Sequence, residues 1–264
     1  MELTPCKAKN VLVVGETCSD IFVYGKSSRL CPDVPVPVFV PEKKVENPGM
    51  AGNTAKNLEA LGIKVDLIHQ SKPITKTRYV ESKLNYTFLR VDEGENEVSP
   101  RANYLFDTQQ RPLMDYDAVV ISDYGKGFLT EERIETYCCS HPNTFVDTKK
   151  RLGDWCKKAR AIKINSIEFE ATKDYIKLDE WVDNLIVTLG DRGCMYNKLG
   201  RFHYYPVEQV DVFDLSGAGD TFHAGLVAEY LETEDMEAAI KFANRCASEV
   251  IQKKGVTVTD AKNK

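Results

Sequence analysis

The sequence has no long apolar run and no concentration of charge of one sign. None of its apolar stretches approaches the ~20 residues of a membrane-spanning helix. The net charge is -5 at pH 7 and no long basic segment occurs, so the charge pattern does not predict nucleic-acid binding. The segment Met1–Lys9 lacks the apolar core of a signal peptide. We therefore expect a cytoplasmic protein that binds neither nucleic acid nor membrane.

Cysteine is present, but in no arrangement that indicates a metal site or a disulfide framework. The eight cysteines are scattered and none forms a Cys-x-x-Cys pair. The spacings of Cys, His and carboxylates suggest no structural zinc site. Without a secretory signal, free thiols are expected. The neighbouring Cys138 and Cys139 fall in a predicted helix, where packing is favoured over redox chemistry.

Short apolar runs alternate along the chain with segments of helical periodicity. Continuous apolar runs are typical of strands buried on both faces of a parallel sheet. The strands expected on this basis cover residues 10–15, 65–69, 117–122, 144–147, 161–164 and 184–188. A chain of 264 residues is long enough for a full core. The alternation predicts one α/β domain, residues 1–264, as a three-layer αβα arrangement around a mainly parallel central sheet.

A loop of small residues runs directly into a helix at Gly217-Ala218-Gly219-Asp220. From Thr221 onward apolar residues recur at helical spacing, so the first amides of the helix point back at the loop. A helix N-terminus with free N–H groups is an anion site, and small residues let a ligand approach the backbone. Asp220 either caps this helix or takes a proton from a hydroxyl while the amides hold a transferring phosphoryl group.

The stretch 214–226 resembles the C-terminal signature of the ribokinase-like (PfkB) sugar kinases, whose core is Gly-Ala-Gly-Asp. The resemblance implies a ribokinase-like fold with a small β lid, ATP as phosphoryl donor, Mg2+, and a sugar or sugar phosphate as acceptor. It implies that Asp220 takes the hydroxyl proton and that the amides of Gly217, Ala218 and Gly219 stabilise the transferring group. Leu215 departs from the small or β-branched residue usual there, which should affect packing more than chemistry.

The acceptor side of such a site has two counterparts near the N-terminus. Asp20 follows the first predicted strand, where the family places a carboxylate that accepts bonds from sugar hydroxyls. The stretch 47–58 is similar to the family's N-terminal signature and implies sugar contacts at Gly49 and Asn53. Met50 stands in place of a second glycine, and we expect it to narrow or reshape the pocket. The alternative is an ordinary turn and helix start.

Two later segments resemble the family's nucleotide-binding motifs. Asn165 and Glu168 match its Asn-x-x-Glu motif and are implied to hold Mg2+, largely through water, with Ser166 as the expected helix cap. The implied contacts with ATP lie in a Val-Thr-x-Gly-x-x-Gly stretch and in the last long helix, at Thr188, Gly190, Gly193 and Asn244. The glycine loop is not a Walker A motif, because no Gly-Lys-Ser/Thr follows.

Two segments, at about 20–40 and 72–92, are expected to form the lid. Alternating valine and proline in the first cannot be a central strand, because proline removes ladder donors. In the second, Lys76, Arg78 and Arg90 alternate with other residues at strand period. A basic row on one lid face would bind a substrate phosphate; the alternative is a solvated edge strand protected by charge.

Residues 24–38 closely resemble one branch of the family, the D-glycero-D-manno-heptose-7-phosphate kinases. The resemblance implies a heptose 7-phosphate as acceptor, phosphorylated at the anomeric oxygen, and a possible homodimer through the lid strands. The chain departs from this branch after His69, where a further helix and strand are missing. Two alternatives stay open: a ribokinase-like kinase for another sugar, and a non-catalytic sugar or nucleotide sensor on the same fold.

Overall fold

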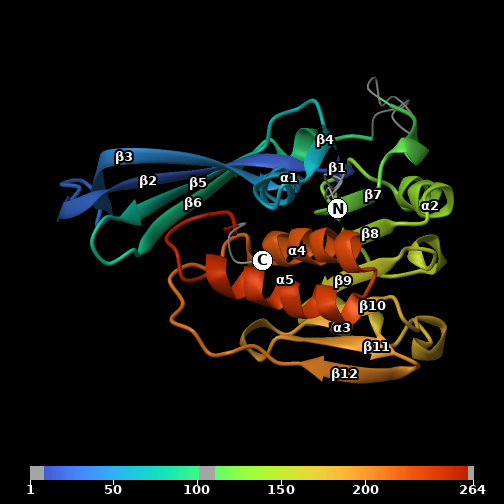
Figure 1. Ribbon diagram of the computed structural model, residues 1–264. Helices are drawn as coiled ribbons and strands as arrows, with labels where there is room; N and C mark the ends of the chain where they lie inside the picture. The colour runs from blue at the N-terminus through green and yellow to red at the C-terminus, as the bar shows by residue number, and fades with distance from the viewer. Residues whose placement is uncertain (1–8, 101–110, 261–264) are drawn as a thin grey trace, which may run out of the picture.

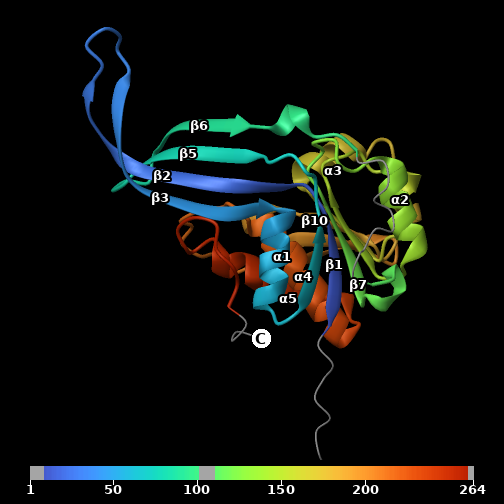
Figure 2. The same cartoon turned by 90° about the horizontal axis from the view of Figure 1, so that it is seen from above.

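A computed structural model of the chain describes residues 9–100 and 111–260 (Figure 1). An eight-stranded sheet with helices on both sides forms the body, and a four-stranded sheet extends from one end of it (Figure 2). The signal-peptide expectation depends on the segment Met1–Lys9, and residues 1–8 of it lie outside the described residues. Cys6 is one of these residues. The seven cysteines within the described residues are free thiols.

The body sheet is mainly parallel, as the continuous apolar runs predicted. Its strands stand in the order β12-β11-β10-β9-β8-β7-β1-β4. Those from β4 to β10 are parallel, whereas β11 and β12 are antiparallel additions at one edge. The bounds are β1 (Asn10–Gly15), β4 (Lys64–Ile68), β7 (Ala118–Asp123), β8 (Thr144–Thr148), β9 (Ala161–Asn165), β10 (Leu185–Thr188), β11 (Cys194–Lys198) and β12 (Arg201–Tyr205).

Helices cover both faces of the body sheet and complete the expected three layers. Val11 and Val13 of β1 belong to a core with α1, α4 and α5, while Leu12 and Val14 face a second core with α2. Successive residues of a strand point to opposite faces, so one apolar strand supplies both cores. The helices are α1 (Ala51–Ala60), α2 (Glu131–Ser140), α3 (Ser166–Thr172), α4 (Ala218–Thr233) and α5 (Met236–Val250). Short 3-10 turns are η1 (Glu95–Glu97), η2 (Leu113–Asp115), η3 (Asp154–Cys156), η4 (Leu178–Glu180) and η5 (Gly190–Arg192).

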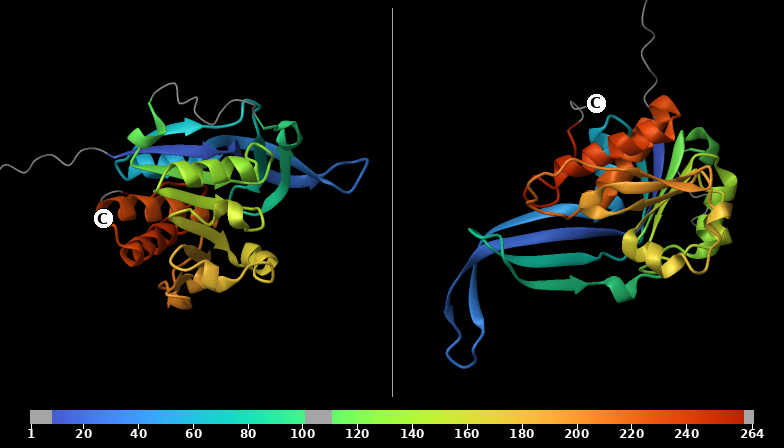
Figure 3. Two further views of the ribbon diagram at one scale, coloured as in Figure 1. Left: turned by 90° about the vertical axis from the view of Figure 1, so that its right-hand side faces the viewer. Right: turned by 90° about the horizontal axis from the view of Figure 1, so that it is seen from below.

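The second sheet is the lid. Its strand order is β3-β2-β5-β6, and β2 is antiparallel to β3 but parallel to β5. Its strands are β2 (Thr17–Leu30), β3 (Pro37–Met50), β5 (Thr75–Glu81) and β6 (Thr87–Glu93). The proline-rich segment leads into β3, an edge strand, where missing ladder donors are tolerated. The β2–β3 hairpin projects well past the end of the body sheet (Figure 3).

Among the described helices, none combines the length and the apolar character needed to cross a membrane.

Candidate active site

Asp220 lies in the first turn of α4 and is almost fully buried, with 4% of its surface exposed. Asn53 Nδ2 of α1 donates to Asp220 Oδ2 at 3.0 Å, and the Tyr124 hydroxyl donates to Asp220 Oδ1. Gly217, before the helix, has φ 84°, and a Cβ there would lie 2.6 Å from Asn53 Nδ2. Glycine is therefore required at this position both for its left-handed backbone and for space. The arrangement brings residues from three distant parts of the chain to one carboxylate.

The environment of Asp220 suits a base. Burial raises the pKa of its carboxyl to about 6, against the lowering effect of the hydrogen bonds from Tyr124 and Asn53. A carboxylate with a pKa nearer neutrality is a stronger base, yet it stays mostly ionised at pH 7. The bonds to both oxygens also fix the orientation of the carboxylate. The simple capping alternative is not seen: within the described residues Asp220 bonds to Asn53 and Tyr124, and α4 has no side-chain cap.

Two buried asparagines connect this carboxylate to the end of the chain. Asn57 Nδ2, one turn along α1, donates to Asn53 Oδ1 at 3.1 Å. The Thr259 N–H donates to Asn57 Oδ1 at 3.0 Å. These bonds orient the amide of Asn53, so that its Nδ2 faces Asp220. Sequence reasoning missed Asn57, although its spacing of four residues from Asn53 places both on one helix face.

Glu16 organises the loop that carries Tyr124. It follows β1, is fully buried, and accepts bonds from the N–H groups of Tyr124 (2.8 Å), Lys126 (3.2 Å) and Phe128 (3.1 Å). Burial and then the nearby Asp123 raise the pKa of Glu16. Sequence reasoning assigned no role to Tyr124 or to Glu16. A lone carboxylate directly after an apolar strand was the available signal.

A cavity of about 650 Å³ opens beside Asp220, between α4, α5 and the ends of β9 and β10. All but one of the residues predicted for catalysis and nucleotide binding line this single cavity: Asn165, Thr188, Gly190, Gly193, Gly217, Ala218, Gly219, Asp220 and Asn244. The N-terminus of α4 therefore faces a space of ligand size. The Ala218 N–H donates to the Leu215 carbonyl oxygen at 3.3 Å, a long bond with which an anionic ligand would compete.

Lys163 and Asp147 form a buried ion pair on the floor of this cavity, with Lys163 Nζ 2.7 Å from Asp147 Oδ2. A Cβ on Gly219 would lie 3.1 Å from Lys163 Nζ, so the ammonium group is next to the small-residue loop. Burial would raise the pKa of Asp147, but Lys163 and then Lys149 hold it below its ordinary value. Sequence reasoning missed Lys163, although it is the one charged residue in the apolar strand β9.

Asn165 and Glu168 meet at the start of α3, and here the expected cap was wrong. Asn165, not Ser166, is the N-cap: its Oδ1 accepts from the Glu168 N–H at 2.9 Å, and Glu168 Oε2 accepts from the Asn165 N–H at 2.7 Å. Asn165 has the extended backbone that this reciprocal box requires, whereas Ser166 is already helical. Glu168 itself is the one predicted residue that does not line the cavity, and it pairs with Lys149.

The donor set beside the cavity fits a Mg2+–nucleotide complex. Carboxylate and amide oxygens come from Asn165, Glu168 and Asp147, the ligand type that Mg2+ prefers. Asp147 Oδ1 is buried and has no hydrogen-bond partner among the described residues, so it is available to a cation or its water. Within the same residues, no group of three or more His, Cys, Asp or Glu side chains is arranged to hold a metal ion by itself. Water and phosphate would have to supply the remaining ligands.

On the acceptor side, Asp20 and Gly49 are in direct contact. Asp20 Oδ1 accepts from Arg78 Nη1 at 2.8 Å, and a Cβ on Gly49 would lie 2.1 Å from Asp20 Oδ2. Met50 has φ 56° and ψ -134°, a conformation normally reserved for glycine. Its side chain is 3% exposed and packs with Cys18 and Ile74. Met50 thus fills an apolar cluster next to Gly49, one of the predicted acceptor residues.

The basic row of the lid exists, and each of its members is paired. Arg78 and Arg90 stand opposite each other in the ladder, and Lys76 is two residues before Arg78, so all three share a face. Their carboxylate partners are Asp20 for Arg78 at 2.8 Å, Asp92 for Arg90 at 2.7 Å and Glu95 for Lys76 at 3.6 Å. The row is therefore close to neutral.

Comparison with known proteins places these features in context. Residues 98–263 match the family described as pfkB family carbohydrate kinase. The chain is 31% identical over 297 residues to the bifunctional protein HldE of Helicobacter pylori (strain J99), covering 94% of this chain and 64% of that protein. It is 27% identical over 303 residues to HldE of Hahella chejuensis, covering 99% of this chain and 64% of that protein.

The chain thus spans less than two thirds of the length of these curated relatives. The first alignment, at 297 residues, is longer than the 264-residue chain, so that relative carries segments with no counterpart here. Among solved structures, Arabidopsis thaliana ribokinase complexed with ribose and ATP has a TM-score of 0.70 at 14% identity, covering 97% of each chain. Ribokinase from Thermotoga maritima has a TM-score of 0.69 at 18% identity, covering 93% of this chain and 94% of that chain. At these identities the structures show a shared fold.

Proposed function

The chain belongs to the pfkB family of carbohydrate kinases, and we propose that it transfers the γ-phosphate of ATP to the anomeric hydroxyl of a heptose 7-phosphate. The observation that carries the kinase chemistry is Asp220, buried at the mouth of the nucleotide-sized cavity and oriented by Tyr124 and Asn53. The choice of acceptor rests on the resemblance of residues 24–38 to the heptose-7-phosphate kinases and on the likeness to HldE.

In the proposed reaction, Asp220 accepts the proton of the acceptor hydroxyl. The hydroxyl oxygen then forms a bond to the γ-phosphorus while the bond to the β-phosphate oxygen breaks, so that ADP leaves. The amides of Gly217, Ala218 and Gly219 and the ammonium group of Lys163 stabilise the charge on the transferring group. Placing these groups on the rigid ends of β9 and α4 means that little reorganisation is needed during transfer.

Residues on either side of Asp220 hold the two substrates in this proposal. Thr188, Gly190, Gly193 and Asn244 bind ATP, and Asn165 and Glu168 hold Mg2+ largely through water. When bound, Mg2+ neutralises phosphate charge. Asp20, Gly49 and Asn53 bind sugar hydroxyls, and the lid cations Lys76, Arg78 and Arg90 keep the acidic lid side chains in place around them.

Another sugar remains the second candidate acceptor, because Met50 replaces a glycine beside the acceptor residues. A sensor without activity is disfavoured by the complete set of catalytic groups around Asp220. Fold alone decides neither question.

The test is ADP release from Mg-ATP with a panel of acceptors, with Asp220→Asn as control. The panel contains D-glycero-D-manno-heptose 7-phosphate, sedoheptulose 7-phosphate, fructose 6-phosphate, ribose and adenosine. Turnover of the heptose phosphate that is lost in the variant supports the proposal. Turnover of another sugar alone keeps the kinase and rejects the heptose. ATP binding with no turnover on any member rejects the heptose and favours a sensor or an acceptor outside the panel.

A further inference from the structure

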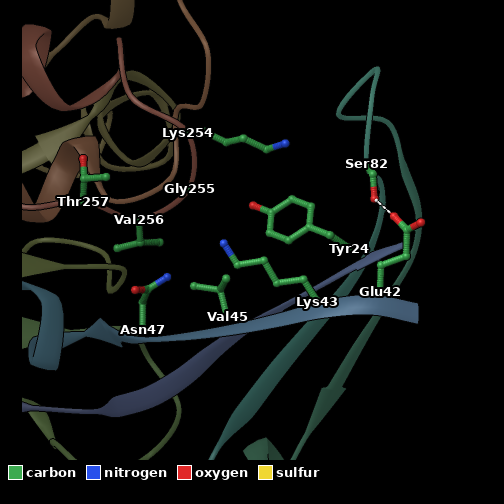
Figure 4. A pocket seen from close by; sticks show the side chains of 10 residues that line it. All are labelled: Tyr24, Glu42, Lys43, Val45, Asn47, Ser82, Lys254, Gly255, Val256 and Thr257. Carbon is green, nitrogen blue, oxygen red and sulfur yellow. Dashed lines mark hydrogen bonds between the residues drawn. The ribbon is translucent and has the colours of Figure 1, made fainter. Parts of the chain in front are cut away.

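A second cavity lies between the lid and the C-terminal segment, apart from the nucleotide cavity (Figure 4). Its volume is about 590 Å³. Tyr24 of β2, with Lys43 and Asn47 of β3, lines one side, and Lys254 and Thr257 line the other. In Figure 4 the side chain of Lys43 extends from β3 into the space below Tyr24, and Lys254 extends from the C-terminal segment above it.

The two lysines of this cavity differ from the other lid cations. Among the residues that the structure describes, neither Lys43 nor Lys254 lies within ion-pair distance of a carboxylate. Lys254 Nζ lies 4.5 Å from the centre of the Tyr24 ring, a cation–π contact that leaves its charge uncompensated. The one carboxylate in the wall, Glu42, is already bound by Lys26 at 2.5 Å and by the Ser82 hydroxyl at 2.8 Å. With two lysines and one carboxylate, the described residues that line the cavity carry a net positive charge.

Neutral polar groups complete the wall. Thr257 Oγ1 is buried and has no hydrogen-bond partner in the described part of the chain. The amide of Asn47 also faces the cavity (Figure 4). A buried hydroxyl without a partner is costly, so an oxygen-rich ligand at this place would relieve it. Two cations, a hydroxyl and an amide are a donor set suited to a phosphate group.

The cavity lies on the same face of the lid sheet as Asp20. In the ladder, Asp20 pairs with Asn47, Phe22 with Val45 and Tyr24 with Lys43, so the same sheet face leads from Asp20 to Lys43. On the opposite side, a Cβ on Gly217 would lie 3.4 Å from Val256, which joins the loop before Asp220 to the cavity wall. Asn47 and Lys43 are four residues apart, ~13 Å along the strand, and the Lys43 side chain can reach back over part of this distance.

We propose that this cavity binds the phosphate monoester at the far end of the acceptor sugar, with Lys43 and Lys254 as its two cationic ligands. The inference rests on the proposed function in taking the acceptor to be a sugar phosphate. The paired row of Lys76, Arg78 and Arg90 is less suited to binding this phosphate, because a phosphate there would have to displace carboxylates. An acceptor without a distal phosphate would leave the two lysines without a counterion.

The chain offers matched controls one residue away from each lysine. Lys44 lies next to Lys43 but on the other face of β3, 3.7 Å from Glu46. Lys253 precedes Lys254 and pairs with Glu249 at 2.6 Å. Lys43→Met and Lys254→Met are therefore compared with Lys44→Met and Lys253→Met. Each control removes one positive charge at the neighbouring position in the sequence.

The first experiment measures kcat and KM with D-glycero-D-manno-heptose 7-phosphate and with the unphosphorylated heptose. For Lys43→Met and Lys254→Met the KM of the phosphorylated sugar should rise about ten- to a hundredfold, the loss expected for a bond to a charged group. Their kcat, their KM for the unphosphorylated sugar and all constants of the two controls should change less than about threefold. An equal rise for both sugars, or the same rise in the controls, overturns the proposal.

The second experiment does not depend on turnover, and so separates this inference from the identity of the acceptor. Inorganic phosphate is titrated calorimetrically into wild type and into the Lys43→Met/Lys254→Met double variant, with ADP saturating the nucleotide cavity. Saturable binding to wild type that is lost in the double variant supports the site, even if no sugar in the panel is turned over. Equal binding to both proteins overturns it. Binding at the lysines that does not compete with a phosphorylated acceptor assigns the site to free phosphate and rejects the substrate role.

Discussion

The body and the lid of this protein hold their polar side chains in opposite ways. In the body, Asp220, Asn53 and Lys163 are nearly inaccessible, and each is fixed by a partner from another element. In the lid, Arg90 and Asp92 form an ion pair between side chains that keep 45% and 33% of their exposure. In a more buried lid pair, the side chains of Arg78 and Asp20 are still 18% and 12% exposed.

This difference matches the roles proposed for the two regions, catalysis in the body and sugar binding in the lid. A base and its charge-stabilising groups must be held in one geometry and away from water, which the packed ends of β9 and α4 provide. A surface that admits and releases a sugar must stay accessible, and exposed ion pairs contribute little rigidity. Changes in the body should therefore lower kcat, whereas changes in the lid should raise the KM of the acceptor.

The largest effect is expected for Asp220→Asn. The amide keeps the shape of the side chain but cannot accept a proton, so kcat should fall about 10² to 10⁴-fold, the usual contribution of a general base. Affinity for ATP should remain within about threefold, since the nucleotide cavity is unchanged. Steady-state kinetics and equilibrium ATP binding check this, and near-normal turnover would remove Asp220 from the mechanism.

A lid change of similar type should act on binding. Arg78→Met removes the partner of Asp20, so the acceptor KM should rise about tenfold or more while kcat changes little, given the usual value of a bond between charged groups. Arg90→Met, opposite Arg78 in the ladder, removes a more exposed pair and should raise KM less. A larger effect at Arg90 than at Arg78, or a fall in kcat alone, would contradict the division between body and lid.

Removing the Tyr124 hydroxyl tests the role of Asp220 through the pH dependence of kcat. If Asp220 is the base, as proposed, kcat should fall as pH drops through its pKa of about 6. The bond from Tyr124 lowers this pKa, so Tyr124→Phe should raise it and move the acid limb upward. A shift of about one unit would lower kcat about fivefold at pH 6 and hardly at all at pH 8.

The matched control for that experiment is Tyr116→Phe. Tyr116 also donates its hydroxyl to a carboxylate, Asp66 at 2.7 Å, but on β4 at the edge of the body sheet. Its pH–rate profile should overlay that of wild type. An acid limb that fails to move in Tyr124→Phe would separate the hydroxyl from the ionisation of the base.

The smallest effect concerns stability where the two regions join. Met50 has a positive φ but also a buried side chain. Met50→Ala loses the packing and keeps the strain, whereas Met50→Gly loses the same packing and relieves it. The glycine variant should therefore be about 1 kcal/mol more stable than the alanine variant in urea unfolding, although both fall below wild type. The reverse order would show that the backbone of Met50 is unstrained.

The sequence was most informative where its signals were local. The strand–helix alternation predicted the three layers, and the motif around Gly217 to Asp220 predicted one wall of the cavity. Local patterns were sufficient there because parallel strands bring their carboxyl ends, and the loops that follow them, to one edge of the sheet. The motifs at Asn165 and Thr188 lie side by side in the cavity for the same reason.

Tertiary structure decided what each charged side chain meets. The sequence by itself determined the fold and the family resemblance, and it indicated the proposed base, because these depend on short apolar runs and on contiguous motifs. Only the folded chain showed that Glu16 supports Tyr124 and that Lys163 is next to Gly219. It also showed that Arg78 is paired, whereas Lys43 has no carboxylate partner within residues 9–100 and 111–260. The physical reason is that burial and ion pairing depend on strand register and on contacts between residues far apart in the chain, which no local pattern records.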